Sequence, residues 1–587
     1  MNGIVGGTMS PQDVVRDLER VTAALPSAED RPGQKQMAQA IASALSNGRH
    51  LIVQAGTGTG KSAAYLVPAI TSGKRVVVVT ATKALQDQLA TKDLPFIETH
   101  LGRPFEWAVL KGRSNYLCLQ RIRESLATPE ARGQGQLEIE ELAPSVRVEV
   151  KRLTEWAGHT KTGDQAELDW APSDKAWSEV SVGSEECPGA TRCPMGTACF
   201  SEGARGRAAV ADVAVVNTHL YGLDVASGGA ILPEHEVVIF DEAHQLEDVM
   251  SDTVGVSIGP GRFTRIAQAL RRVIEDPQII GAVSDAASLL REVLAPDVGT
   301  RLSNPLPTAL VDALIEGRGR VDRAGDALRA IDTKVEDAKQ RVLRAQTLSL
   351  RLMEHIDAAL TFGTQYVAFV SGGPESPRLE VAPLDVGPVL AASVWDKRTA
   401  ILTSATIPAS LMERVGLPAD RTDIVDVGSP FDFEHHALLY CAMHLPDPRS
   451  PGYGAAVAEE LVALITAAGG RTLALFTSWK AMEQAAEAVK AKLPFRILTQ
   501  RDLPKPALVK AFSQDPTSCL FATAGFFQGV DIPGDTLTLV TIDRIPFPRP
   551  DDPLLEARRE RIGAAAFRTI DLPRAAMLLA QASGRLI

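Results

Sequence analysis

The sequence lacks any run of about 18 apolar residues, the length that a helix needs to cross a bilayer. It also lacks low-complexity tracts. Its first residues show no charged stretch followed by a long apolar one, as a secretory signal requires. These absences predict a cytoplasmic protein. With 587 residues, 45% of them hydrophobic and 23% charged, the chain has a globular composition and is too long for one core, so we expect roughly four domain-sized units.

Positive charge is also in deficit, because the formal net charge is −11. This charge argues against a protein that coats nucleic acid non-specifically, as a histone does. It is compatible with a basic channel inside an acidic protein, because binding responds to the local potential. Cysteine is scarce and unevenly placed, since four of the six lie between residues 111 and 205.

The stretch from Gln54 to Ser62 reads Gln-Ala-Gly-Thr-Gly-Thr-Gly-Lys-Ser, and the rest of the chain is organised around it. An apolar run, 50–53, precedes it, and an apolar-rich segment, 63–70, follows and predicts a helix. Strand, glycine-rich turn and helix predict a phosphate-binding loop, in which small residues let backbone N–H groups approach a phosphate chain. Lys61 would meet the β- and γ-phosphates, and Ser62 a magnesium ion. The alternative is a glycine-rich turn that binds nothing.

The element Arg31-Pro-Gly-Gln34 lies just upstream and opens another predicted helix. The side-chain amide of Gln34 can both donate and accept, as recognition of an adenine edge requires. An ordinary helix start is the alternative, but the distance from Lys61 favours adenine recognition. The predicted nucleotide-binding residues are Arg31, Gln34, Ala55, Gly56, Thr57, Gly58, Thr59, Gly60, Lys61 and Ser62.

Polar residues follow a β-branched run at 74–80, which predicts a buried parallel strand. Ligands bind at the carboxyl ends of strands in α/β sheets. Thr82, Lys83 and Gln86 could therefore hold a nucleic-acid backbone.

A second apolar run leads into Asp241-Glu-Ala-His244. A strand that delivers Asp241 to the sheet edge beside a phosphate loop predicts a magnesium ligand. Glu242, next to it, could orient and deprotonate the attacking water. A solvated turn is the alternative for an isolated acidic pair, but the strand and the phosphate loop together favour the magnesium site.

The region 111–205 interrupts the α/β pattern and contains a group of cysteines. Its members are Cys118, Cys187, Cys193 and Cys199. Structural disulfides are rare in a cytosolic protein, so metal ligation is the favoured role for these cysteines. Zinc usually takes tighter Cys-x-x-Cys pairs, and no histidine lies within 187–199, so the spacing favours a four-iron, four-sulfur cluster over zinc or unmetallated thiols. Cys441 and Cys519 stand singly in apolar runs and are predicted to be core residues.

Residues 250 to about 385 follow a helical pattern. Apolar residues at spacings of three and four between 310 and 360 predict an extended helical arm, with a coiled-coil hairpin as one arrangement. Its charged face is expected to be solvated rather than ligand-binding.

The α/β pattern resumes at 399–406, where small hydroxyl residues at a strand end suit a coupling element between two domains. Runs at 471–478 and 520–531 predict the strands of a second α/β unit. No second phosphate loop occurs, so this unit is expected to complete the first one's site. Arg585 is the candidate for neutralising γ-phosphate charge across the cleft.

These motifs resemble those of the iron–sulfur superfamily 2 DNA helicases of the DinG and XPD type, and the DinG branch most. The resemblance runs nearly end to end and in family order, through residues 31–34, 55–62, 80–89, 241–244, 404–406, 476–478, 525–531 and 581–585. Cys118 closes a Lys-Gly-Arg-x-Asn-Tyr-x-Cys element, and the four cysteines resemble the family's iron–sulfur insertion. The resemblance implies ATP-driven 5′ to 3′ movement on single-stranded or forked DNA, in DNA repair or the response to replication stress, by a monomeric protein.

The resemblance also implies an α/β fold with two RecA-like parallel-sheet motor domains, the first carrying an inserted iron–sulfur domain and an inserted helical arch. Cluster and arch would form the pore where the DNA strands part. The expected boundaries are 1–110, 206–249 and 386–415 for the first helicase domain, 111–205 for the cluster insertion, 250–385 for the arch and 416–587 for the second helicase domain.

Motifs and resemblance together assign the roles in the site. The expected catalytic residues are Lys61, Asp241, Glu242, His244, Gln581 and Arg585. Magnesium is expected on Ser62 and Asp241, and a [4Fe-4S] cluster on Cys118, Cys187, Cys193 and Cys199. DNA phosphates are expected at Thr82, Lys83 and Thr477, and DNA bases are expected to stack on Tyr116 and Phe526.

The last motif departs from the family pattern. In the family, Gln-x-x-Gly-Arg continues to a second arginine three residues later, whereas this sequence stops at Ile587, just before that position. Either the sequence is a fragment or the protein lacks a γ-phosphate contact and its closing helix. We expect the chain as given to bind ATP and single-stranded DNA but to hydrolyse and unwind poorly. Only a short segment precedes Arg31, which predicts that the exonuclease domain of some family members is absent. The alternatives are an ATP- and DNA-binding protein with little turnover and a redox sensor that reports through its cluster.

Overall fold

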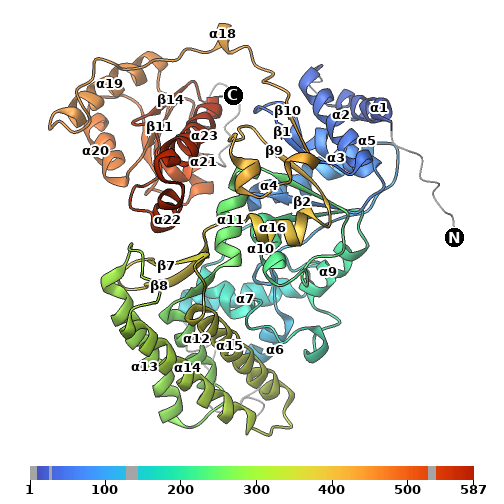
Figure 1. Ribbon diagram of the computed structural model, residues 1–587, viewed down its shortest axis with the longest axis vertical. Helices are drawn as coiled ribbons and strands as arrows, with labels where there is room; N and C mark the ends of the chain where they lie inside the picture. Colours follow the sequence, from blue (N-terminus) through green and yellow to red (C-terminus); the bar gives the residue numbers. More distant parts are fainter. Residues whose placement is uncertain (1–9, 26–28, 127–142, 527–536, 587) are drawn as a thin grey trace.

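The computed structural model describes residues 10–25, 29–126, 143–526 and 537–586. Within these ranges the fold is α/β, as expected, with two parallel sheets and a third, smaller antiparallel sheet beside a group of long helices (Figure 1). None of the helices in the described ranges is long and apolar enough to cross a membrane.

The first parallel sheet contains the phosphate-binding stretch. Its strands lie in the order β10, β1, β9, β5, β2, β4, β3. Their bounds are Thr422–Asp426, His50–Gln54, Thr399–Ser404, Val237–Asp241, Val76–Thr80, Val213–Asn217 and Trp107–Val109. Neighbouring strands are parallel throughout, and the apolar runs are buried because helices cover both faces.

Alternate side chains along the strands feed two separate cores. In β2, Val76 and Val78 pack into one core, and Val77 and Val79 into the other. The first core is covered by α1 (Pro11–Ala23), α2 (Pro32–Asn47), α3 (Lys61–Thr71) and α5 (Leu94–His100). The second is covered by α9 (Phe200–Val210), α10 (Thr218–Ala226), α11 (Leu246–Val254), α16 (Gly387–Leu390) and α17 (Leu411–Arg414). The short α4 (Lys83–Gln88) follows β2.

Strand β10 differs from the expected domain division. We expected the second helicase domain to start at residue 416, but β10 pairs with β1 along its length and so belongs to the first sheet. The sequence of β10 is polar and half exposed, which is ordinary for an edge strand but gave little signal.

The cysteine-containing insertion is a small unit with its own core. Its helices are α6 (Leu119–Leu126), α7 (Pro144–Ala157) and α8 (Asp174–Val180). Leu117, Leu153 and Trp177 are among the side chains buried between them.

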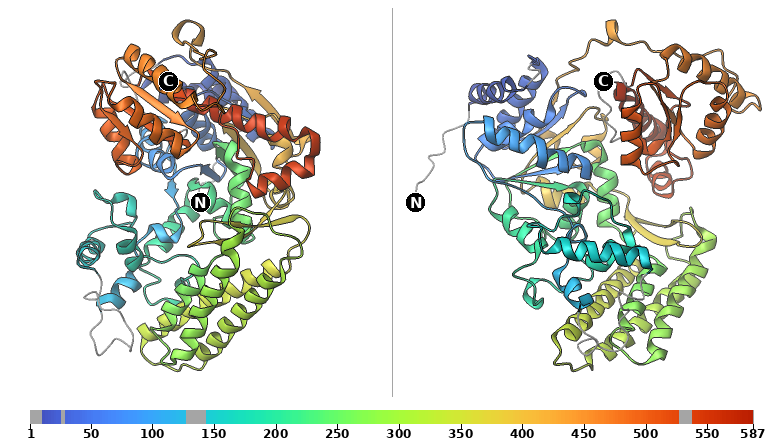
Figure 2. Two further views of the ribbon diagram at one scale, coloured as in Figure 1. Left: turned by 90° about the vertical axis from the view of Figure 1, so that its left-hand side faces the viewer. Right: turned by 180° about the vertical axis from the view of Figure 1, so that it is seen from behind.

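The predicted helical arm is present, together with a sheet that was not predicted. The helices are α12 (Pro260–Leu270), α13 (Pro277–Leu294), α14 (Thr308–Arg329) and α15 (Glu336–Leu360). The strands β6 (Val256–Ile258), β7 (Tyr366–Ser371) and β8 (Arg378–Pro383) form an antiparallel sheet in the order β6, β8, β7. This unit lies at one end of the long axis of the molecule, away from the two parallel sheets (Figures 1 and 2).

The second parallel sheet has the order β12, β13, β11, β14. Its strands are Ile497–Thr499, Cys519–Thr523, Thr472–Phe476 and Leu539–Ile542. The helices of this unit are α19 (Tyr453–Ala468), α20 (Trp479–Lys490), α21 (Lys505–Gln514), α22 (Pro553–Ile562) and α23 (Leu572–Ser583). The connection from β10 passes over the top of the molecule in Figure 1 through α18 (Phe433–His436).

Candidate functional site: a nucleotide site between two motor units

The phosphate loop joins β1 to α3, as the sequence predicts. Gly58 and Gly60 have φ values of 76° and 79°, a left-handed backbone that glycine adopts without strain. A side chain at position 60 would collide with Gln34, because its Cβ would lie 2.2 Å from the amide nitrogen. Lys61 begins α3, so its ammonium and the free amides of the helix start lie at the same place. The Lys61 Nζ lies 3.4 Å from the Ala55 carbonyl oxygen.

Arg31 and Gln34 brace the phosphate loop from the start of α2. The Arg31 guanidinium donates to the Gly58 carbonyl at 2.6 Å, and the Gln34 amide donates to the Gly60 carbonyl at 3.0 Å. Gln34 is buried and Arg31 is partly exposed. The element expected at the adenine is therefore in direct contact with the loop expected at the phosphates.

Sheet order brings the acidic pair to the same edge. Strand β9 lies between β1 and β5, and its register pairs Ser404 with Gln54 and Thr403 with Asp241. The phosphate loop, Ser404 and Asp241 thus leave three adjacent parallel strands at their carboxyl ends. Glu242 follows with φ of 54°, a left-handed conformation that is uncommon outside glycine and often found where a side chain is held for function.

The two carboxylates have different environments. Burial and the charge of Glu242 together raise the pKa of Asp241 to about 6, against the opposing effects of Lys61 and Tyr65. Burial would also raise the pKa of Glu242, but hydrogen bonding to His244 and the charge of Lys61 outweigh it and lower that pKa to about 2. Glu242 is thus held ionised. A carboxylate with so low a pKa orients a water molecule better than it removes its proton.

A chain of hydrogen bonds links the second motor unit to Glu242. The Gln581 amide of α23 lies 2.8 Å from Nε2 of His244, whose Nδ1 lies 2.8 Å from the Ser404 hydroxyl. Ser404 in turn donates to Glu242 at 3.0 Å. With Nε2 accepting from the amide, Nδ1 carries the proton that it donates to Ser404, which assigns the tautomer. Gln581, His244 and Ser404 are all buried, so the chain is shielded from water.

Arg585 follows the end of α23 beside the phosphate loop. A Cβ at Gly584 would lie 3.6 Å from the Thr57 hydroxyl, which places this turn against the loop. The Arg585 Nε donates to the Gln581 carbonyl at 3.1 Å. The structure therefore brings Gln581 to His244 and places the turn that carries Arg585 beside the phosphate loop.

Sequence reasoning missed two polar residues at this site. Tyr65, fully buried in α3, donates to Asp241 at 3.0 Å. Asp93 hydrogen-bonds with Ser62, and burial raises its pKa. It closes a π-helical turn at Leu89–Asp93, a geometry often found at functional sites. The apolar helix around Tyr65 gave no signal, whereas the turn that exposes Asp93 to Ser62 has no recognisable spacing.

The four cysteines of the insertion line one pocket, together with Arg113 and Glu202. All four are free thiols. Burial raises the pKa of Cys118 to about 11 and also raises that of Cys193. Among the residues that the structure describes, no three or more acidic, histidine or cysteine side chains converge closely enough for a single metal ion.

The residues predicted to contact DNA differ in their exposure. Tyr116 and Phe526 are buried, so the prediction that they stack on bases is wrong: the Tyr116 hydroxyl accepts from the Lys111 amide, and the Phe526 ring fills the core of the second unit. Lys83 and Thr477 are exposed at strand ends, with Lys83 donating to Asn115 at 2.8 Å. The motif from 525 to 531 lies largely outside the described residues.

Comparisons with known proteins agree with this geometry. The family described as DEAD/DEAH box helicase matches residues 31–129, and the helicase C-terminal domain matches residues 461–587. A solved XPD helicase structure superposes with a TM-score of 0.59 at 16% identity, covering 95% of this chain and 94% of that chain. The structure of S. tokodaii Xpd4 gives 0.53 at 13% identity, with 94% and 92% covered. Fold and site thus define a superfamily 2 helicase with two RecA-like motor domains.

Curated relatives narrow this class to one family. The chain is 39% identical to the ATP-dependent helicase DinG of Mycobacterium tuberculosis, over 98% of this chain and 90% of the relative. It is 34% identical to the ATP-dependent DNA helicase YoaA of Escherichia coli, over 97% and 91%. The chain belongs to the DinG family of ATP-dependent helicases.

Proposed function

We propose that this protein is a cytoplasmic ATP-driven DNA helicase that moves 5′ to 3′ along single-stranded DNA and carries a [4Fe-4S] cluster. We assign it to DNA repair or the response to replication stress and expect it to act as a monomer on forked DNA. The observation that carries the motor assignment is the buried chain from Gln581 through His244 and Ser404 to Glu242. A residue from one motor unit that fixes the acidic group of the other suits an ATP site that works only when the two units close.

The nucleotide-site residues of the first motor unit have distinct roles. Arg31 and Gln34 hold the loop and recognise the adenine, and the backbone from Ala55 to Gly60 cradles the phosphates. Lys61 neutralises the β- and γ-phosphates, while Ser62 and Asp241 would hold magnesium, which supplies positive charge to the transferred phosphoryl group. Tyr65 and Asp93 orient these two magnesium ligands.

Hydrolysis requires positioning more than proton abstraction. Glu242 would orient the attacking water, and Ser404 and His244 keep that carboxylate ionised and aimed. Through its contact with His244, Gln581 couples the orientation of Glu242 to the position of the second unit. Arg585 would add positive charge at the γ-phosphate, the form of catalysis that dominates phosphoryl transfer.

The cysteine pocket fits a cluster better than a single ion. Its four thiols line one space, yet they are not close enough to share one metal atom. A four-iron cluster, bound by one thiolate at each corner, is wider than a single ion. The neighbouring Arg344 partly offsets the burial that raises the pKa of Cys118. Cys118, Cys187, Cys193 and Cys199 would hold the cluster, which would stabilise the insertion.

The experiment is an unwinding assay with two matched partial duplexes, one bearing a 5′ single-stranded tail and the other a 3′ tail. With ATP and magnesium, we expect strand separation to be faster on the 5′-tailed substrate than on the 3′-tailed one. Glu242→Gln should bind ATP and DNA but fail to separate the strands. Equal unwinding of the 3′-tailed duplex would overturn the direction, and DNA binding without ATP turnover would favour the alternative of a binding protein or cluster-based sensor.

A further inference from the structure

A buried cluster of charges joins the two motor units outside the nucleotide site. From the first unit, Glu247 and Asp248 of α11 contribute carboxylates, and Arg414 of α17 contributes a guanidinium. From the second unit, Arg558 of α22 and Arg574 of α23 reach into the same cluster. Arg574 donates to Asp248 at 2.6 and 2.8 Å and to Glu247 at 3.2 Å. Arg558 lies 3.3 Å from Glu247, and Arg414 also pairs with Glu247.

Most side chains of the cluster are shielded from water, and the cluster has more positive than negative charge. The side chains of Glu247 and Arg558 are each 6% exposed, and that of Arg574 is 13% exposed. Burial and the neighbouring arginines lower the pKa of Arg414 to about 9. Removing the buried Glu247 carboxylate would leave buried guanidinium groups uncompensated, which is strongly unfavourable. The cluster therefore specifies how the two units meet instead of adding general adhesion.

Helix α11 connects this cluster to the chemistry. It begins two residues after His244, so Glu247 and Asp248 occupy its first turn. On the facing side, Arg574 and Gln581 lie on the same helix, seven residues apart, and so project from one face two turns from each other. Gln581 touches His244 while Arg574 touches Asp248. Helix α23 thus meets the first unit at two points, one at His244, in the turn just before α11, and one at the charge cluster on α11.

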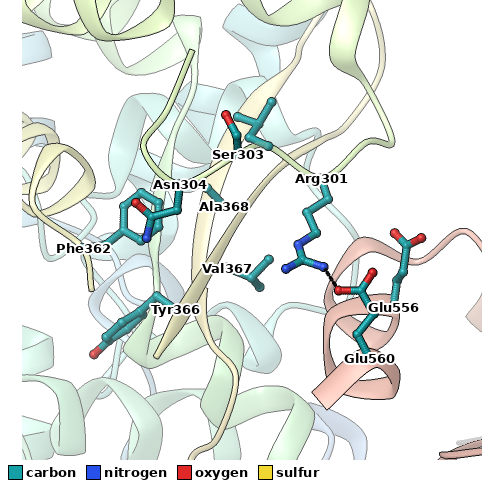
Figure 3. A pocket seen from close by; sticks show the side chains of 10 residues that line it. Arg301, Ser303, Asn304, Phe362, Tyr366, Val367, Ala368, Glu556 and Glu560 are labelled. Carbon is teal, nitrogen blue, oxygen red and sulfur yellow. Dashed lines mark hydrogen bonds and ion pairs between the residues drawn. The ribbon is translucent and has the colours of Figure 1, made fainter. Parts of the chain in front are cut away.

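Helix α22 extends the connection to the helical arm. Arg558 donates to the Ser251 hydroxyl at 2.6 Å and to the Leu384 carbonyl at 3.1 Å, just beyond β8. Two residues further along α22, Glu560 pairs with Arg301, and both line a cavity of about 410 Å³ between α22 and β7 (Figure 3). Figure 1 shows α22 beside both α11 and the β7–β8 sheet. One helix of the second unit therefore contacts both the helix after the catalytic acids and the base of the arm.

We propose that Arg574 and Arg558 are positioning residues for ATP hydrolysis. Their ion pairs with Glu247 and Asp248 seat α22 and α23 on α11, so that Gln581 meets His244 and Arg585 lies at the phosphate loop. Arg558 carries the same seating to the base of the arm. Neither arginine touches the nucleotide residues, so they act through the position of α23. The inference rests on the proposed motor function.

The test compares Arg574→Ala with the parent in steady-state ATP hydrolysis with single-stranded DNA. Because a shift of about 1 Å in catalytic groups can cost about a hundredfold in rate, we expect kcat to fall by about that factor. The KM for ATP should stay near the parent value, because Gln34, Lys61 and Asp241 belong to the first unit. Arg574→Lys keeps the charge but loses the bidentate contact with Asp248. Its kcat should therefore lie between those of the parent and Arg574→Ala. Arg568→Ala, an exposed arginine just before α23, is the matched control and should match the parent.

A double-mutant cycle keeps the test independent of folding. Asp248 is half exposed, so Asp248→Ala should fold. If the pair acts as one unit, the Asp248→Ala, Arg574→Ala double variant should be no slower than Arg574→Ala alone. Effects that multiply would overturn the proposal, as would an unchanged kcat in Arg574→Ala.

Small-angle X-ray scattering with a non-hydrolysable ATP analogue separates this inference from the proposed function. If the parent itself lacks DNA-stimulated turnover, the proposed function fails. The packing of α22 and α23 on α11 can still be tested, because it changes the shape of the molecule. The parent and Arg568→Ala should be compact, and Arg574→Ala more extended. Identical scattering curves for all three would contradict the seating role.

Discussion

Lys61 is the single cation that the phosphate loop itself supplies. In Lys61→Ala the backbone cradle remains, but the charge that meets the β- and γ-phosphates is lost, so ATP turnover should fall by orders of magnitude. DNA binding without nucleotide should change little, because the proposed DNA contacts lie at other strand ends. Turnover assays and DNA-binding titrations on the same preparation measure both. Parent-like hydrolysis in Lys61→Ala would show that the site is elsewhere.

Tyr65 provides a finer test, because its hydroxyl is the side-chain donor to Asp241. Tyr65→Phe keeps the buried ring and removes the donor. Residues that orient metal ligands commonly cost about tenfold or more in metal affinity when changed, so half-saturation of ATPase activity should need about ten times more magnesium. Tyr221→Phe, which loses a comparable buried hydroxyl beside His235, is the control and should need no more magnesium than the parent. An unchanged magnesium requirement in Tyr65→Phe would argue against Asp241 as a ligand.

Residues in contiguous motifs could be predicted from the sequence, and residues set by packing could not. Lys61 and Asp241 stand in short patterns whose chemistry requires a strand end, and the sheet brings both to one edge. Tyr116 and Phe526 were expected at DNA because aromatic side chains stack on bases, but both are core residues. Cys441 was predicted to be buried because its neighbours are apolar, and it is exposed, whereas Cys519 is buried in β13 as expected.

At the scale of elements, the cysteine insertion should depend on its metal. Cys118→Ser should lose the brown colour and about four irons per chain from protein purified without oxygen, and limited proteolysis should then cut the insertion. Both motor units have separate cores and should survive. Cys441→Ser, an exposed thiol outside the pocket, should keep colour and iron. Stoichiometric zinc in protein made with ample iron would exclude the cluster.

The segment before β5 should make stability depend on pH. Burial lowers the pKa of His235 to about 4, against about 6.5 in an unfolded chain. The folded state therefore favours the neutral ring, and its stabilising contribution is complete above pH 6.5 and is lost as pH falls towards 4. The slope is at most about 1.4 kcal/mol per pH unit. The drop in melting temperature from pH 7 to pH 5 should be smaller in His235→Gln. An equal drop in both proteins would show that His235 is not protonated on unfolding.

Helices and strands with a strong apolar pattern could be predicted from the sequence, but the pairing of the strands was harder to predict. Val76–Thr80 reads as a buried strand from its β-branched run alone, and α15 from its apolar spacing. The polar sequence of β10 hides its place at the edge of the first sheet, so the expected boundary at residue 415 was too early. The antiparallel sheet at the base of the arm was also missed, because its pairing joins β6 to β8 across four helices.

At the scale of the whole molecule, we propose that the two motor units share one catalytic site. The sequence predicts this sharing because it has no second phosphate loop, but no local pattern states that Gln581 will meet His244. The structure places that contact and the Arg574–Asp248 pair between α23 and the segment formed by α11 and the turn before it. Closing the cleft would therefore set the acidic group, the γ-phosphate charge and the arm together.

Steady-state ATP hydrolysis with and without single-stranded DNA tests most directly whether the two units form one ATP-hydrolysing site. We predict that single-stranded DNA stimulates turnover by the parent chain. That stimulation should be lost both in Lys61→Ala, in the first unit, and in Gln581→Ala, in the second, while Gln581→Ala still binds ATP. Turnover that ignores DNA, or that survives unchanged in Gln581→Ala, would contradict a site shared between the two units.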